Sequence, residues 1–299
     1  MFDLLVVHPL TNLLLGFYIL LGNNLGWAII VFTIVLRIIL LPLTIKQIQT
    51  QKKMQELQPK IQALQSQRKD PTQMTPEEMA LMRQTAGSCL GGVIPIAIQI
   101  PILIGLNMVI NQIASVNSDA SKGGDFFNNV LYFDFLKHSP EYIFNTNFFG
   151  FDLAGIPAQI THDWSLLPYG VLIALLVITQ FIQSKIMNSV QKKSQEKLKK
   201  NKPNQKKLTK EEKEKMEMQE ALNKWTQMQM VYFIPVMIGV GAYSFPAALG
   251  IYWLVQNTFA IIQTIVQYRH ADGKLSIESV KEDIGNFLSR FRKKQDKKA

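Results

Sequence analysis

The sequence predicts an all-α integral membrane protein with five transmembrane helices, its N-terminus outside the cell and its C-terminus in the cytoplasm. Two observations predict this class. Hydrophobic residues make up 47% of the 299 residues and are gathered into long blocks. Lys and Arg, which give the chain a formal net charge of +10, are concentrated in the segments between and after those blocks. A spanning helix needs about 17–25 mainly apolar residues, and short cytoplasmic loops carry an excess of Lys and Arg.

Residues 1–24 are predicted to form an outer interfacial helix, which lies along the outer membrane surface and does not cross the bilayer. Its apolar stretch, residues 13–21, is too short to cross a bilayer. Asn12 precedes this stretch, and the Gly-Asn-Asn sequence at 22–24 ends it. We therefore expect the helix to lie in the outer interface.

The five predicted spans are the long apolar blocks, and we place them at residues 25–45, 91–113, 166–187, 228–243 and 247–268. The fourth span is short and contains Pro235 and several glycines. A locally thinned bilayer would accommodate it.

Residues 46–90, which follow the first span, are predicted to form a cytoplasmic helical hairpin. Met54, Leu57, Ile61 and Leu64 have the 3-4-3 spacing of a coiled-coil seam. Residues 68–71 (RKDP) break the helix, and residues 75–78 (TPEE) are typical of a helix start. A self-packed hairpin without a partner is the alternative interpretation.

The other connections differ in composition. Residues 114–165 form the predicted extracytoplasmic loop, which is rich in aromatic residues. Residues 188–227 form a cytoplasmic loop rich in Lys and Glu, and residues 269–299 form a basic cytoplasmic tail.

Charge sets the orientation. Residues 46–83 carry 7 Lys and Arg, residues 192–224 carry 12 and residues 269–298 carry 9. The loop between the second and third spans has only two, and none precedes Arg37. The positive charge therefore reflects mostly membrane topology and is not evidence of nucleic-acid binding.

Motifs for catalysis or metal binding are missing from the sequence. The single cysteine, Cys89, excludes an intramolecular disulfide and is interpreted as a packing residue. The four histidines have no metal-ligand spacing, and no HExxH, GxSxG or P-loop pattern occurs. We predict no enzyme activity, no cofactor and no metal.

Arg37 is the only charged residue in the first span. It lies eight residues from the cytoplasmic end, roughly 12 Å deep at the rise of an α-helix. A cation in hydrocarbon is costly and needs a polar partner or a water-filled cavity. Several polar residues are expected at a similar depth: Gln99 in the second span, Thr179, Gln180 and Gln183 in the third, Gln256 and Asn257 in the fifth, and Thr33 and Thr44 on the helix face of Arg37.

Their shared depth predicts a polar cavity that opens to the cytoplasm and is closed to the outside. Two other interpretations stay open. Arg37 could snorkel to the inner headgroups, although its side chain spans only part of the depth. The amide side chains could join helices through hydrogen bonds.

Four stretches, in the order of the spans, carry a family resemblance: IIVFTIVLRIILLPLTIKQIQTQKKMQELQPKIQAL, PIAIQIPILIGL, LLPYGVLIALLVITQFIQSKIM and FPAALGIYWLVQNTFAIIQTIV. They resemble the YidC/Oxa/Alb family of membrane protein insertases, in its compact bacterial YidC-like form without a large periplasmic domain. Where family members often have NPLAGCLP before the second span, this chain has TAGSCLGGVIP. The hinge from hairpin to membrane is therefore expected to differ.

The resemblance implies an insertase and chaperone of the bacterial cell membrane, a multi-pass protein that inserts and helps to fold membrane proteins through a hydrophilic groove. The groove would open to the cytoplasm and the inner leaflet. By resemblance, Arg37 holds a hydrophilic, often acidic, segment of the incoming chain. Gln99, Gln183 and Trp253 line the groove, with Gln180 and Gln256 as further candidates.

The resemblance also implies partners. The apolar surfaces of the third and fifth spans would guide the substrate's transmembrane segment into the lipid bilayer. Nascent membrane-protein substrates are the main partners. The hairpin and the basic tail would bind the ribosome and signal-recognition targeting factors, and a Sec-type translocon is a further partner. No cofactor, metal or specific nucleic acid is implied.

Two other functions stay open. The chain could be a scaffold that assembles membrane proteins without insertase activity, with Arg37 in a structural role. It could also transport small anions bound by Arg37, although such transporters usually contain internal repeats and none is visible here.

Overall fold

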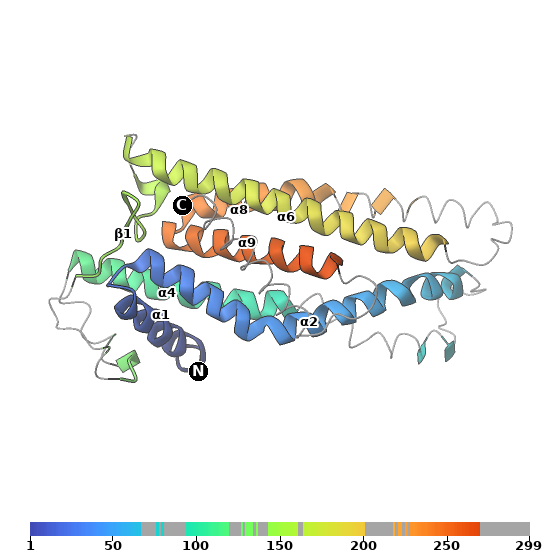
Figure 1. The fold of residues 1–299 in the computed structure, drawn as a ribbon, viewed down its shortest axis with the longest axis horizontal. Coiled ribbons are helices and arrows are strands. Elements are labelled where there is room, and N and C mark those ends of the chain that lie inside the picture. Colours follow the sequence, from blue (N-terminus) through green and yellow to red (C-terminus); the bar gives the residue numbers. More distant parts are fainter. Residues whose placement is uncertain are drawn as a thin grey trace, which may run out of the picture. The chain divides into compact units, whose positions relative to one another are not determined.

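The structure, a computed structural model, is mostly helical (Figure 1). It describes residues 1–66, 76–77, 79–80, 94–119, 127, 129–133, 136, 143–160, 164–200, 218, 221–222, 225–226 and 228–269. The single cysteine, the basic tail from residue 270 and most of the second hairpin arm lie outside these residues. So does most of the predicted loop 188–227 beyond residue 200.

The described chain contains η1 (Asp3–Val7), α1 (His8–Leu20), α2 (Leu25–Ser66), α4 (Ile94–Ser118), β1 (Asn147–Phe148), β2 (Phe151–Asp152), η5 (Pro157–Gln159), η6 (Trp164–Leu166), α6 (Leu167–Lys200), η7 (Gln229–Phe233), α8 (Ile234–Ser244) and α9 (Ala247–Arg269). The strands form one short antiparallel hairpin, in which Asn147 pairs with Asp152 and Phe148 with Phe151. The fold of the described chain is therefore built almost entirely from helices.

Among the residues that the structure describes, five helices are long and apolar enough to cross a membrane, which confirms the all-α integral membrane class. They are Asp3–Leu20, Leu25–Gln47, Ala97–Ser118, Trp164–Ser189 and Ala247–Val266. Val231–Ser244 is a shorter apolar helix, as its composition led us to expect. These five helices are therefore not the five predicted spans. Asp3–Leu20 takes the place of the short predicted span 228–243, because the N-terminal helix is longer than its apolar stretch.

The N-terminal helix begins near Asp3 because the π-helix η1 continues into α1, whose first turn contains Pro9. It ends as predicted at the Gly-Asn-Asn sequence. Gly22 and Asn23 have positive φ angles of 76° and 59°, and the amide of Asn23 donates to the carbonyl of Tyr18 at 2.8 Å. This is a left-handed helix cap, which Gly and Asn tolerate best.

The chain divides into two compact units. The first consists of Met1–Ile39, Ala97–Gln183 and Met230–Phe259. The second includes the described residues within Leu40–Ile96, Ser184–Gln229 and Ala260–Ala299. All six predicted site residues belong to the first unit.

The second unit contains continuations of spanning helices. α2 runs without interruption for 42 residues, through the predicted first span and into the predicted hairpin. α6 likewise continues to Lys200, beyond the predicted end of the third span at residue 187. Most side chains of the expected hairpin seam lie outside the described part of the chain.

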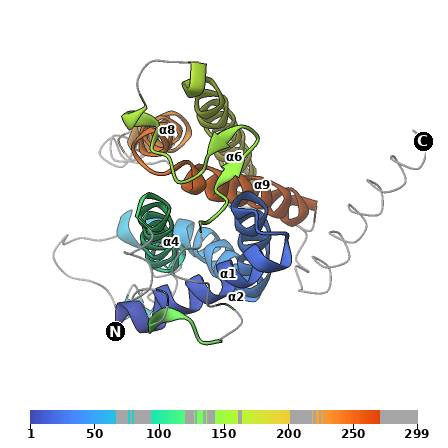
Figure 2. The ribbon, with the colours of Figure 1, turned by 90° about the vertical axis from the view of Figure 1, so that its left-hand side faces the viewer.

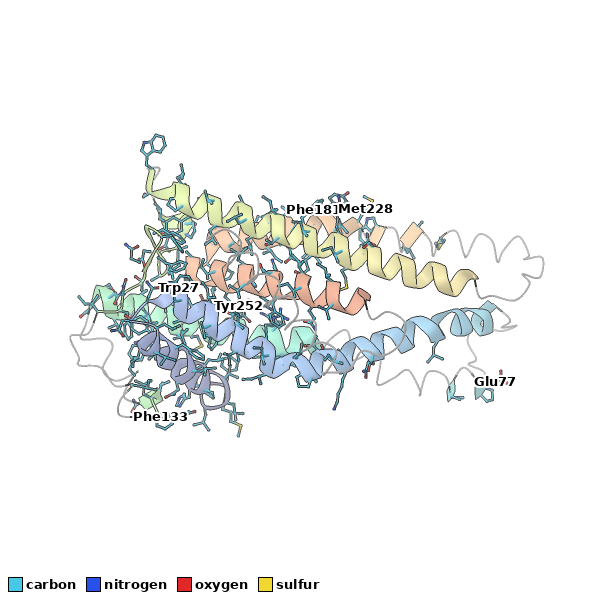
Figure 3. The ribbon with its side chains drawn as sticks, viewed as in Figure 1. Trp27, Glu77, Phe133, Phe181, Met228 and Tyr252 are labelled. Atoms are coloured by element: carbon cyan, nitrogen blue, oxygen red, sulfur yellow. The ribbon has the colours of Figure 1, made fainter. Side chains whose placement is uncertain are left out.

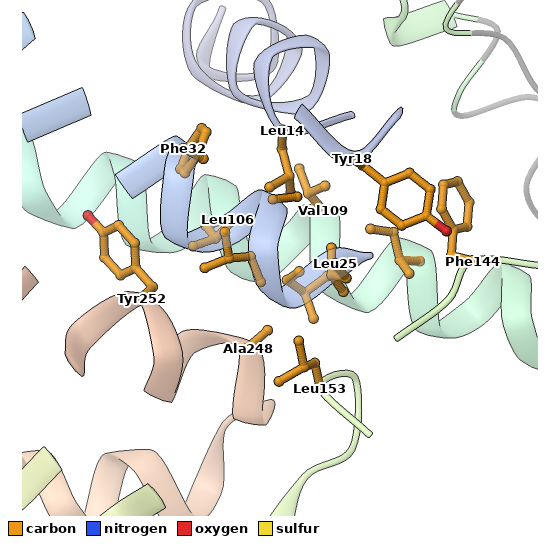
Figure 4. Close-up of a cluster of buried hydrophobic side chains, with 14 of the residues drawn as sticks. Leu14, Tyr18, Leu25, Phe32, Leu106, Val109, Phe144, Leu153, Ala248 and Tyr252 are labelled. Carbon is orange, nitrogen blue, oxygen red and sulfur yellow. The ribbon is translucent and has the colours of Figure 1, made fainter. Parts of the chain in front are cut away.

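Within the first unit, α9 lies between two groups of helices (Figure 2). On one side, its Gln256 bonds to Gln99 of α4. On the other side, Leu172 of α6 approaches Gly250, and Trp253 approaches Gly241 of α8. Figure 4 shows the buried apolar cluster, which joins α1, α2, α4, α9 and the loop through residues such as Leu14, Leu25, Leu106 and Leu153.

Apolar side chains also cover outward-facing surfaces of the helices. On α6, the exposed residues Leu167, Val171, Leu175, Ile178 and Ile182 follow the 3-4 spacing of one helix face. On α4, Ile100, Ile104 and Met108 do the same. Continuous exposed apolar stripes of this kind suit contact with lipid.

Candidate functional site

Arg37 lies in the apolar part of α2 and is partly buried. Its neighbours Ile34, Ile38 and Ile39 are exposed apolar residues. The sequence has no Asp or Glu at residues 25–47, 97–118, 164–189 or 231–266. A carboxylate within these helices therefore cannot neutralise Arg37, and its positive charge must be stabilised by polar groups or water.

A hydrogen-bonded cluster joins α4 to α9 close to Arg37. The side-chain amide of Gln99 donates to the hydroxyl of Tyr252 at 3.0 Å and to Oε1 of Gln256 at 3.1 Å. In return, the amide of Gln256 donates to Oε1 of Gln99 at 2.5 Å. Tyr252 and Gln256 lie one turn apart on α9, so both side chains face α4.

Tyr252 connects this cluster to Arg37. Its side chain is only 3% exposed, and its phenol lies within electrostatic range of the guanidinium of Arg37. Figure 3 marks its position among the helices, and Figure 4 shows its ring extending from α9 toward α4. Because Gln99 donates to the phenol oxygen, that oxygen acts as an acceptor in the cluster and presents partial negative charge.

Three of the six predicted site residues are thus brought together: Arg37, Gln99 and Gln256. Gln180 and Gln183 lie on α6, and in the described part of the chain neither is hydrogen-bonded to this cluster. Oε1 of Gln183 is buried without a hydrogen-bond partner among the described residues. Trp253 faces α8 instead, where its ring packs edge-on against Phe245 with centroids 6.5 Å apart.

The threonines expected near Arg37 use their hydroxyl groups within their own helices. Thr33 donates to the carbonyl of Ile29 at 2.6 Å, and Thr44 donates to that of Leu40 at 2.9 Å. Thr179 donates in the same way to Leu175. These hydroxyl protons are therefore not available to a ligand.

The sequence interpretation missed Tyr252, because an aromatic residue in a spanning helix usually suggests packing. The available signal was its spacing, since Tyr252 precedes Gln256 by one turn and so shares its helix face. Two further amides, Asn107 Oδ1 and Asn257 Nδ2, are buried without a partner among the described residues. Buried polar atoms of this kind are usually satisfied by water.

The donor set does not suggest a metal site. Among the residues that the structure describes, no three His, Cys, Asp or Glu side chains are grouped so that they could hold a metal ion. The candidate site is instead a cation surrounded by amides and a phenol. Such groups can bind a peptide segment through hydrogen bonds and charge.

Comparison with known proteins identifies the family. The model of the 60Kd inner membrane protein family matches residues 16–274. Membrane protein insertase MisCA of Bacillus subtilis is 30% identical over 269 residues, which cover 88% of this chain and 78% of that protein. Membrane protein insertase YidC of Oceanobacillus iheyensis is 28% identical over 266 residues, which cover 87% and 81% respectively. YidC 2 of Bacillus anthracis is 29% identical over 263 residues.

Proposed function

Because the chain belongs to the 60Kd inner membrane protein family, which is the YidC/Oxa/Alb family, we propose that Arg37 and its polar neighbours receive the hydrophilic part of a substrate. The protein is a membrane protein insertase, a multi-pass protein of the bacterial cell membrane. It acts on membrane proteins within the lipid bilayer. The family is one of insertases and chaperones rather than of known enzymes.

The observation that carries the proposal is a partly buried cation in a predicted span without acidic residues, beside the cluster of Gln99, Tyr252 and Gln256. In this proposal the polar residues line a groove that opens to the cytoplasm and the inner leaflet. A polar segment in hydrocarbon is costly, and a hydrated groove shortens the apolar distance that it must cross. The fixed charge of Arg37 attracts acidic groups in a site of low dielectric.

Gln180, Gln183 and Trp253 extend the proposed groove toward α6 and α8. The unpartnered Oε1 of Gln183 is an acceptor that a substrate amide or water could satisfy. The exposed apolar stripe of α6 is well suited to guide the substrate's transmembrane segment into lipid. Burial of that segment supplies free energy, so no nucleotide is required.

Further partners are proposed to bind at the predicted hairpin, residues 46–90, and at the basic tail, residues 269–299. In this proposal the hairpin and the basic tail recruit the ribosome and signal-recognition targeting factors, and the protein also works beside a Sec-type translocon. The composition of both segments supports this role, because Lys and Arg attract RNA and anionic lipid.

The experiment uses purified protein in liposomes and a single-span substrate with an acidic N-terminal tail. Protease protection of the tail measures insertion. We expect Arg37→Ala and Arg37→Glu to lose insertion and Arg37→Lys to retain much of it. Lys46→Ala is a matched control, because Lys46 is an exposed cation just past the predicted first span, residues 25–45. Normal insertion by Arg37→Ala would assign Arg37 to structure and contradict the proposal.

A second substrate separates charge from general polarity. It has the same transmembrane segment and a neutral tail. Because attraction to Arg37 depends on the carboxylates, we expect Arg37→Ala to affect the neutral substrate much less than the acidic one. Equal loss for both substrates would mean that Arg37 maintains the hydration or shape of the site instead.

A further inference from the structure

The turn of the β1–β2 hairpin contains an unusual residue. Phe149 and Gly150 join the strands with φ angles of 49° and 85°. Two-residue turns with positive φ at both positions favour Asn-Gly or Asp-Gly, and a bulky side chain in this region is a genuine outlier. The Phe149 side chain is nevertheless 79% exposed. Among the described residues, its ring contacts only that of its neighbour Phe148, at a centroid distance of 4.5 Å.

Hydrogen bonds attach the residues on either side of the turn to three helices. The carbonyl of Asn145 accepts from the amide of Leu25 at 3.2 Å, and that of Leu153 accepts from Ala248 at 2.8 Å. The hydroxyl of Tyr169 donates to the carbonyl of Asp152 at 2.9 Å. These bonds attach the segment to the beginnings of α2, α9 and α6 respectively.

The attachment places the turn beside the first residues of helices that are long and apolar enough to cross a membrane. Phe148 is buried and packs edge-to-face against Trp27, the third residue of α2, with centroids 5.7 Å apart. Trp27 is 49% exposed, and Trp164, at the start of the membrane-long helix Trp164–Ser189, is 85% exposed. Aromatic residues are enriched where transmembrane segments meet the headgroups.

We propose that Phe149 is a lipid anchor, whose ring inserts at the headgroup level of the leaflet in which α2, α6 and α9 begin. The proposal explains why an exposed phenylalanine occupies a position that suits asparagine. Continuity with the membrane-long helices identifies lipid as the occupant, since Trp27 belongs to the span and supports the turn through Phe148. The anchor goes beyond the insertase function, because it sets the depth of the end of the protein at which these helices begin.

The first test measures where residue 149 lies in a bilayer. In a Cys89→Ser background, Phe149→Cys and the control Asn147→Cys are labelled with an environment-sensitive fluorophore. Asn147 is an exposed polar residue of the same hairpin. In nanodiscs of phosphatidylethanolamine and phosphatidylglycerol, we expect quenching by spin-labelled lipid at 149 and by aqueous iodide at 147. Equal iodide quenching at both positions would overturn the proposal.

The second test retains an aromatic ring, in case the cysteine variant does not fold. p-Benzoylphenylalanine replaces Phe149 or, as the control, Asn147 in the full chain, and native membranes are irradiated. We expect lipid adducts to be several times more frequent at 149 than at 147. A protein adduct at 149 would overturn the proposal, because residue 149 would then contact a protein and not lipid. Equal lipid yields at both positions would remove the anchor altogether.

Discussion

At the scale of single residues, the hydrogen-bond directions determine what the cluster offers to Arg37. Both protons of the Gln99 amide are used, one by Tyr252 and one by Gln256. The side-chain amide of Gln256 in turn donates a hydrogen bond to Oε1 of Gln99. The oxygen of Tyr252 is consequently held as an acceptor near a cation that has only donors.

Removal of that oxygen should weaken the site without changing the packing. We expect Tyr252→Phe to keep the ring but lose about 1 kcal/mol of interaction, or about fivefold in the insertion rate of an acidic-tailed substrate. Insertion into liposomes measures the rate. Tyr243→Phe is the control, since Tyr243 is an exposed tyrosine of α8. Wild-type rates for Tyr252→Phe would reduce Tyr252 to a packing residue.

The reciprocal bond between Gln99 and Gln256 should show strong coupling. Each single change to Leu leaves a partly buried amide without its partner, which costs up to about 1–3 kcal/mol. The double change removes both amides, so we expect it to cost less than the sum of the two. Unfolding in denaturing detergent gives the three free energies. Additive values would mean that the two amides are satisfied independently, for instance by water.

At the scale of elements, close contacts between helices and the loop depend on individual glycines. A Cβ built on Gly26, near the start of α2, would lie 2.1 Å from the Phe148 ring. A Cβ on Gly16 of α1 would meet nothing within 4 Å. The same substitution should therefore have opposite effects at these two positions.

We expect Gly26→Ala to displace Phe148 and lower the melting temperature. Gly16→Ala should leave it unchanged or raise it, because Ala is favoured over Gly in a helix by up to about 1 kcal/mol. Thermal unfolding of both variants under identical detergent conditions makes the comparison. Adding Phe148→Ala should restore part of the loss in the Gly26 variant. A neutral Gly26→Ala would show that the hairpin adjusts without cost.

Depth along a helix was predictable from the sequence, whereas rotation about its axis was not. Counting residues from the span ends placed Arg37, Gln99 and Gln256 at one level. In the structure Gln99 and Gln256 are hydrogen-bonded to each other, and Arg37 interacts electrostatically with Tyr252 of the same cluster. Trp253 was expected in the same place, but it follows Tyr252 by about 100° of helical rotation and faces α8. Helix packing decides that rotation, and periodicity alone does not reveal it.

Helix length was predicted less well than helix position. The N-terminal helix lies within the predicted range 1–24, but it is longer than the apolar stretch 13–21 on which its length was judged, because a helix continues past polar residues such as His8. α2 continues past the predicted end of its span because the Gln-rich and Lys-rich sequence that follows has good helix propensity. The apolar pattern indicates what the membrane can cover, not where the hydrogen bonds stop.

At the scale of the whole molecule, the N-terminal helix is the element on which the topology depends. Asp3–Leu20 is long and apolar enough to cross a membrane. However, the side chain of Asn12, at the midpoint of this helix, is hydrogen-bonded to the loop. It donates to the carbonyl of Val130 at 2.8 Å and accepts from the amide of Tyr132 at 2.7 Å. Near the end of the helix, Tyr18 accepts from the amide of Asn145 at 2.8 Å. The predicted extracytoplasmic loop thus holds both the middle and the end of this helix.

These contacts favour a helix that does not cross. From Asp3 to Asn12 the helix rises only about 13 Å, less than half of a hydrocarbon core of about 30 Å. If the loop stays outside the core, the first residues cannot reach the opposite surface. We therefore expect the N-terminus to lie on the same side as the loop, in agreement with the distribution of Lys and Arg.

Cysteine labelling of intact cells tests this orientation. In a Cys89→Ser background, we expect an impermeant maleimide to label Phe2→Cys and Asn147→Cys from outside, because both positions are exposed. Ser189→Cys, at the other end of the membrane-long helix Trp164–Ser189, should react only after permeabilisation. If Phe2→Cys also required permeabilisation, the first helix would cross. The loop contacts of Asn12 would then have to enter the bilayer with their polar groups paired, since unpaired groups in hydrocarbon cost several kcal/mol.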